Sequence, residues 1–238
     1  MTNTRLIAGG LLAAVPLVLV AGFTGLQITF EYPDILRHPA GDVLTKFAAG
    51  RADLHAYWYM MFAAGIALLP AAIGLTIIYW KANPFGAAMI GTFGVLAGLV
   101  QSLGLLRWTV LVPRLAANYT APGASELDKA LAASAFDSAN AYLGMGVGEH
   151  MGYLFTALFT LSVTIVIARQ WPVMAWVGVA FATGIAAGML EVLGVRGVSS
   201  INAIAFMGWS VWAVALGVLI LRGRSEGIAG IPQTAQAG

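Results

Sequence analysis

The stretch HAYWYMMFAAGIALLPAAIGLTIIYW (residues 55–80) contains no Asp, Glu, Lys or Arg. About 20 apolar helical residues cross the roughly 30 Å hydrocarbon core of a bilayer, so this stretch predicts a transmembrane helix. Lipid offers the backbone no hydrogen-bond partner, which is why the segment must be helical. Five more predominantly apolar stretches occur at residues 6–30, 85–106, 147–168, 172–194 and 202–221. The predicted fold class is therefore all-α, an integral membrane bundle of six transmembrane helices.

The composition of the 238-residue chain agrees with the lipid bilayer as its main partner. Hydrophobic residues make up 60% of the chain and charged residues only 9%, whereas globular proteins have about 25% charged residues. The net charge of +2 comes without a basic cluster, which argues against a nucleic-acid partner. The absence of cysteine excludes disulfides, thiolate metal sites and thiol catalysis.

Two long polar loops separate the apolar stretches, at residues 31–54 and 108–146. In the second loop, Ser125 can cap a helix over Glu126–Tyr142, where apolar residues recur at helical spacing. This pattern predicts a surface helix that leads into the fourth span. We expect residues 1–224 to form one membrane domain, and residues 225–238, rich in Gly, Ala and Gln, to be disordered.

The basic residues in the short connections predict the orientation. Lys81 and Arg169 lie in short connections, and Arg5 and Arg222 flank the first and last spans. Basic residues in short loops favour the cytoplasmic side. Both termini are therefore predicted to be cytoplasmic, with the two long loops outside.

Polar residues gather near the predicted outer ends of spans three to six. Ionisable groups at membrane depth cost roughly 2.5–3.5 kcal/mol each, so they pair, line a polar cavity or reach the headgroup level. We expect Glu149 to pair with Arg107. The candidate ligand-binding residues are Gln101, Arg107, Glu149, His150, Tyr153, Glu191 and Asn202. They predict an outer polar pocket for a small amphiphile or ion.

Three functional hypotheses follow. The first is a non-enzymatic protein that uses this pocket for sensing or transport; no catalytic residue and no cofactor are predicted for it. The second is an accessory subunit that packs against a membrane protein partner, or a homo-oligomer, through small-residue helix faces. The third is a membrane haem or metal protein that uses His55 and His150, although there is no His-Glu-x-x-His pattern.

The sequence also resembles a family of proteins in three places. These are Phe30–Leu36 followed by Arg37, His38 and Pro39; Leu105–Trp108 followed by Val112, Pro113, Leu115, Ala116 and Tyr119; and Gly148, Glu149, His150, Gly152 and Tyr153. The chain is similar over residues 6–222 to a family of bacterial multi-pass membrane proteins catalogued as a domain of unknown function. The resemblance implies a small inner-membrane bundle and brings no substrate, cofactor or catalytic residue.

Overall fold

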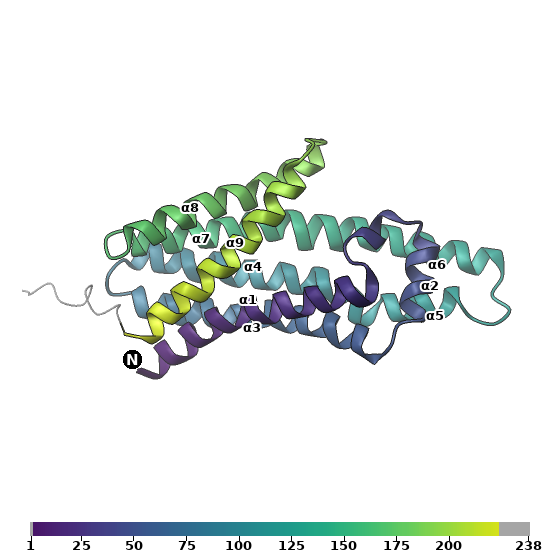
Figure 1. Cartoon of the computed structure of the whole chain (residues 1–238), viewed down its shortest axis with the longest axis horizontal. Coiled ribbons are helices and arrows are strands. Elements are labelled where there is room, and N and C mark those ends of the chain that lie inside the picture. The colour runs from purple at the N-terminus through teal and green to yellow at the C-terminus, as the bar shows by residue number, and fades with distance from the viewer. Residues whose placement is uncertain (1, 224–238) are drawn as a thin grey trace, which may run out of the picture. The chain divides into compact units, whose positions relative to one another are not determined.

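The computed structural model describes residues 2–223, and within them every regular element is a helix (Figure 1). The predicted tail at residues 225–238 lies outside the described residues. In chain order the elements are α1 (Thr2–Phe30), η1 (Asp34–Arg37), α2 (Ala40–Ala48), α3 (Ala52–Tyr79), α4 (Pro84–Val110), α5 (Val112–Tyr119), α6 (Glu126–Ala139), η2 (Asn140–Met151), α7 (Gly152–Ile167), α8 (Pro172–Ala187), η3 (Gly188–Leu193) and α9 (Val198–Leu221).

The all-α membrane fold is confirmed. Six helical segments of the described chain are long and apolar enough to cross a bilayer: Asn3–Phe30, Ala52–Tyr79, Pro84–Tyr119, Glu126–Ile167, Pro172–Leu193 and Val198–Leu221. Each contains one of the six predicted spans or nearly all of it. The chain is therefore a multi-pass membrane protein.

The two long loops contain more helix than the sequence predicted. Beyond the predicted end of span three at residue 106, α4 continues to Val110 and α5 follows directly, with a proline at its start. The first loop contains the amphipathic helix α2, which buries Val43, Leu44 and Phe47. The predicted cap of α6 is confirmed, because Ser125 forms a reciprocal capping box with Asp128.

The described chain divides into two compact units, and each is described by itself. Unit 1 consists of residues 2–14, 68–95 and 155–223, and unit 2 consists of residues 15–67 and 96–154. Because α1, α3, α4 and α7 each contribute residues to both units, the division does not follow the order of the helices. It assigns α8 and α9 to unit 1, and α2, α5, α6 and η2 to unit 2.

In unit 1, polar side chains tie α9 to its neighbours. Trp212 donates its indole Nε1–H to the carbonyl of Met174 on α8 at 2.8 Å. Trp209 donates to the Thr160 hydroxyl on α7 at 2.8 Å, and that hydroxyl donates to the carbonyl of Thr156 at 2.7 Å. The threonines of α7 therefore bond to their own helix and to a packed indole, which supports their interpretation as helix-packing residues.

An aromatic core holds unit 2 together. Trp58 of α3 and Trp108 of α4 are fully buried and stack with ring centroids 4.3 Å apart and an interplanar angle of 5°. Phe30, Phe47 and Phe136 bring further rings to this pair from α1, α2 and α6. The helices α2, α5 and α6 pack side by side (Figure 1). This core positions the end of α4, where the candidate site begins.

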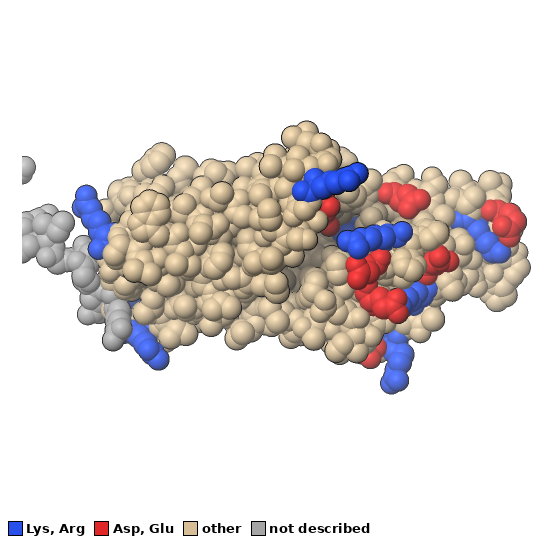
Figure 2. Space-filling model, turned by 45° about the horizontal axis from the view of Figure 1, so that its top comes forward, with Lys and Arg blue, Asp and Glu red and all other residues tan. Residues whose placement is uncertain are grey.

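Charged side chains of both signs intermix on the part of unit 2 that contains α2, α5 and α6 (Figure 2). The ion pairs found there include Lys46 with Glu31 at 2.7 Å and Lys129 with Glu126 at 2.9 Å. Such exposed pairs contribute about 0–1 kcal/mol each. Exposed ion pairs of this kind are expected where a segment is in contact with water. The aromatic core contributes more to the stability of unit 2 than these ion pairs do.

Candidate ligand-binding site

The centre of the site is Arg107, near the end of α4. Its side chain is only 6% exposed. Nη1 donates to the carbonyl of Gly104, and Nη2 donates to Oδ1 of Asn140 at 3.1 Å. The guanidinium also lies over the ring of Trp108, 5.2 Å from its centroid, in a cation–π contact. Both hydrogen-bond acceptors are uncharged, so neither of these two bonds neutralises the buried positive charge.

A π-helix lies against this guanidinium. The element η2 carries Asn140 at its start and glycines at 144, 146 and 148. A Cβ atom on Gly144 would lie 2.6 Å from Nη2 of Arg107, and one on Gly104 would lie 2.6 Å from Cα of Gly148. Only glycine at these positions allows η2 to approach both the guanidinium and the backbone of α4 so closely. Segments of π-helix occur frequently at functional sites.

The carboxylate of Glu149 and the hydroxyl of Tyr32 belong to the same electrostatic environment. Glu149 is half-buried on η2, and its charge interacts with Arg107. Tyr32 follows α1 and is half-buried against the aromatic core. The pKa of Tyr32 is raised to about 12, mainly by burial and also by the negative charge of Glu149, while the positive charge of Arg107 opposes the shift. Unit 2 therefore brings the predicted residues Arg107 and Glu149 close enough for their charges to interact.

Four buried nitrogen atoms in this region have no hydrogen-bond partner among the described residues. They are Nε of Arg107, Nε1 of Trp58, Nε1 of Trp108 and Nδ1 of His150. Leaving a buried polar group unsatisfied costs about 1–3 kcal/mol. Arg107, Trp108 and Trp58 are contiguous through the cation–π contact and the indole stack. The site thus concentrates unused hydrogen-bonding capacity in one small region of unit 2.

Gln101 and Tyr153, also predicted site residues, are half-buried in unit 2. Gln101 lies against Gly152 at the start of α7, where a Cβ atom would come 3.1 Å from Cγ of the glutamine. Both residues are therefore within unit 2, near the junction of η2 and α7. That they bind a ligand stays a prediction.

The other two predicted residues belong to unit 1. Glu191 is exposed on η3. Asn202 is buried, and its Nδ2 donates to the carbonyl of Ile185 at 2.8 Å, which ties the start of α9 to α8. The side-chain amide of Asn202 thus has a structural partner within its own unit.

The two histidines considered for a metal or haem differ in their surroundings. His55 is exposed and packs edge-on against Phe47, with ring centroids 5.0 Å apart. His150 is half-buried on η2. Within residues 2–223, no group of three or more His, Cys, Asp or Glu residues could hold a metal ion. A metal or haem bound by His55 and His150 stays a prediction.

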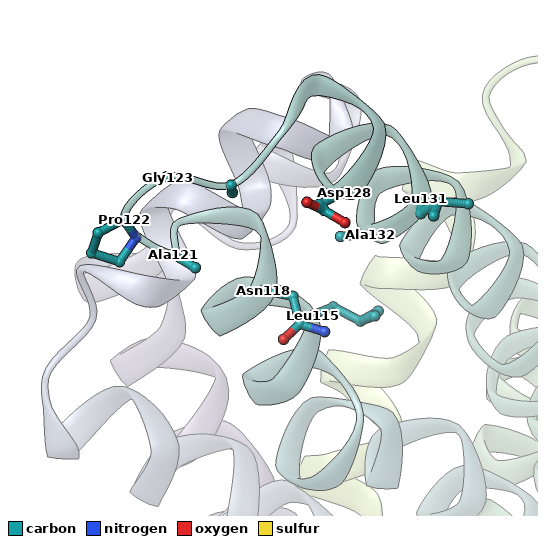
Figure 3. Close-up of a pocket in the computed structure, with 9 residues that line it drawn as sticks. Leu115, Asn118, Ala121, Pro122, Gly123, Asp128, Leu131 and Ala132 are labelled. Atoms are coloured by element: carbon teal, nitrogen blue, oxygen red, sulfur yellow. The ribbon is translucent and has the colours of Figure 1, made fainter.

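Unit 2 also has a pocket of about 560 Å³ between α5 and α6 (Figure 3). Leu115, Pro122 and Leu131 provide much of its apolar lining, and Asn118 and Asp128 add polar groups. The Asp128 carboxylate already accepts hydrogen bonds from the hydroxyl and backbone N–H of Ser125. No predicted site residue lines this pocket.

Sequence reasoning missed Asn140 and Trp58 as members of the site, whereas Tyr32 and Trp108 lie in the motifs of the family resemblance. A further signal was the run Gly144, Gly146 and Gly148, because three glycines in five residues weaken an α-helix and permit close backbone approach. Nothing in the local sequence pattern pairs Asn140 with Arg107, which lies 33 residues earlier in the chain.

Comparison with known proteins gives one match. No curated protein and no solved structure matches the chain. The family described as "Domain of unknown function (DUF4386)" matches residues 7–223, which confirms the resemblance found in the sequence motifs. The chain belongs to this DUF4386 family.

Proposed function

We propose that this protein is a non-enzymatic protein of a bacterial inner membrane that binds a small amphiphile or ion at the Arg107 site, for sensing or transport. The observation that carries the proposal is the buried guanidinium of Arg107, which bonds to two uncharged acceptors while its Nε lacks a partner among the described residues. A buried charge without full compensation is strongly unfavourable, so such residues usually have a function.

The composition of the site supports a ligand with both a polar and an apolar part. The guanidinium lies over Trp108, which belongs to a core of stacked indoles and phenyl rings, and ligand sites are mostly apolar with a few well-placed polar groups. Glu149 provides an opposite charge in the same region. A site with both a positive and a negative side chain can bind an ion or the charged headgroup of an amphiphile.

The orientation proposed from the basic residues places the loops of unit 2 outside. Lys81 and Arg169 are exposed in the short connections after α3 and α7, and such residues favour the cytoplasmic side. Both termini are then cytoplasmic, and the Arg107 site lies toward the outer leaflet. Cysteine accessibility labelling at Lys81 and at Asp42 of α2, in right-side-out vesicles, tests this orientation.

Native mass spectrometry of the protein in nanodiscs made from total polar lipid extract of the host tests the binding function. Wild-type protein, Arg107→Ala, Glu149→Gln and the control Arg114→Ala are compared. Arg114 is exposed on α5, so its removal should leave the retained small molecules unchanged. We expect the retained molecules to change in both site variants. If folded Arg107→Ala and Glu149→Gln retain the same molecules as wild type, the proposal is wrong.

A further inference from the structure

The unused hydrogen-bonding groups beside Arg107 have one chemical property in common. Arg107 Nε and the indole Nε1 atoms of Trp58 and Trp108 have no partner among the described residues. A guanidinium and an indole nitrogen can only donate hydrogen bonds; neither can accept one. A group on a ligand that satisfies any of them must therefore be a hydrogen-bond acceptor.

The charge of the site points to the same chemistry. The acceptors of the two Arg107 Nη atoms, the Gly104 carbonyl and Oδ1 of Asn140, are uncharged. Hydrogen bonds between a guanidinium and an oxyanion are roughly twice as strong as neutral ones. An oxyanion on Nε would satisfy a donor that has no partner among the described residues, and it would add a negative charge beside a residue that is only 6% exposed.

The neighbouring rings define the rest of the ligand. The guanidinium lies over Trp108, which stacks on the fully buried Trp58. Phe30 and Phe47 also pack against Trp108. These rings are buried side chains of the core, and an alkyl or aryl group next to the oxyanion would gain by contact with them, because apolar carbon is stabilised by apolar side chains.

We infer that the Arg107 site binds an oxyanion, a phosphate or carboxylate group, attached to a short apolar chain. The inference rests on the proposed function and specifies its ligand. Glu149, whose charge interacts with Arg107, then opposes binding of the anion. Removing the Glu149 charge should strengthen binding, whereas removing the Arg107 charge should weaken it. A cationic ligand would give the opposite pair of effects.

Isothermal titration calorimetry on the protein in phosphatidylcholine nanodiscs tests this, with butyl phosphate, butylammonium and butanol as probes. We expect butyl phosphate to bind best. Arg107→Gln should weaken its binding by roughly ten- to a hundredfold, because a charge-assisted hydrogen bond is lost. Glu149→Gln should strengthen it severalfold, and Arg114→Gln should leave it unchanged. Trp108→Phe, which keeps a ring and removes one donor, should weaken it by about fivefold even if Arg107→Gln does not fold.

The outcomes separate this inference from the function on which it rests. If butylammonium binds and Glu149→Gln abolishes that binding, the site takes a cation; the proposed function stands and the oxyanion inference is overturned. Equal binding of butanol and butyl phosphate, or unchanged binding of butyl phosphate in both Arg107→Gln and Trp108→Phe, also overturns the inference. If no probe binds, the inference and the binding function fail together.

Two further experiments show whether the oxyanion belongs to a free anion or to a lipid headgroup. Inorganic phosphate alone, titrated into the same nanodiscs, should bind if the natural ligand is a free anion. Phosphatidylglycerol nanodiscs analysed by native mass spectrometry should retain one lipid in an Arg107-dependent way if the ligand is a lipid headgroup. If neither inorganic phosphate nor phosphatidylglycerol is bound while butyl phosphate is, a soluble amphiphilic oxyanion is the ligand.

Discussion

Replacing Gly104 by alanine tests the close contact that positions the π-helix. A Cβ atom there would lie 2.6 Å from Cα of Gly148 and 2.9 Å from the carbonyl oxygen of Leu143. Both are backbone atoms, so a side-chain rotation cannot relieve the clash and η2 must move away from α4. Gly146→Ala on η2 is the matched control, because its Cβ would lie 3.7 Å from the nearest atom, the carbonyl oxygen of Ala141.

Both variants gain helix propensity, but only Gly104→Ala introduces a steric clash. Each gains about 1 kcal/mol from replacing glycine by alanine in a helix. Only Gly104→Ala adds the strain of overpacking, typically about 1–3 kcal/mol. We therefore expect Gly104→Ala to be about 1–3 kcal/mol less stable than Gly146→Ala, in denaturant unfolding in detergent followed by tryptophan fluorescence. Equal stability of the two variants would refute the close approach of α4 and η2.

Three further predictions concern the surroundings of Arg107. Asn140→Ala removes the acceptor of Arg107 Nη2 at 3.1 Å, and it should lower the free energy of unfolding by about 1.5–3 kcal/mol, the usual contribution of a hydrogen bond to a charged group. The hydrogen bond from Lys46 holds the pKa of Glu31 below 4.5, so the Tm difference between wild type and Glu31→Gln should be largest above that pH and disappear in more acidic solution. Burial raises the pKa of Tyr32 from 10 to about 12, so its neutral form should stabilise the fold below pH 10 and lose this effect toward pH 12, seen as a late tyrosinate absorbance step that Tyr32→Phe makes smaller.

Each of these predictions has a clear contrary result. Asn118 is exposed on α5, so Asn118→Ala is a control for Asn140→Ala; equal stability of the two variants would show that the bond to the guanidinium contributes nothing. A constant Tm difference between wild type and Glu31→Gln from pH 3 to 6 would contradict the lowered pKa of Glu31. Titration of every tyrosine near pH 10 would contradict the burial of Tyr32.

The sequence predicts the spans well because the bilayer imposes a simple rule on long apolar stretches. It also places Arg107 and Glu149 at the ends of their spans, because a charge beside an apolar stretch is conspicuous in the sequence. The same rule gives no information about which faces of the helices meet. Trp58 and Trp176 both lie in apolar stretches, but the first is fully buried and the second is 74% exposed.

The partners of Arg107 depend on features that a hydropathy pattern does not contain. Asn140 reaches the guanidinium through the register of η2, where the hydrogen bonds of a π-helix displace side chains from their α-helical positions. Tyr32 enters the core after Glu31, a non-glycine residue with a φ of 55°. Few non-glycine residues have positive φ, so this turn is not expected from the sequence. Both features depend on tertiary packing.

The most direct test of the account is a high-resolution cryo-EM map, around Nε of Arg107, of the protein in phosphatidylglycerol nanodiscs with butyl phosphate added. The account predicts density for an oxyanion, with an oxygen about 2.7–2.9 Å from Nε and a carbon chain along the indoles. A protein acceptor bonded to Nε, or side chains packed closely against it with no further density, would contradict the proposed site.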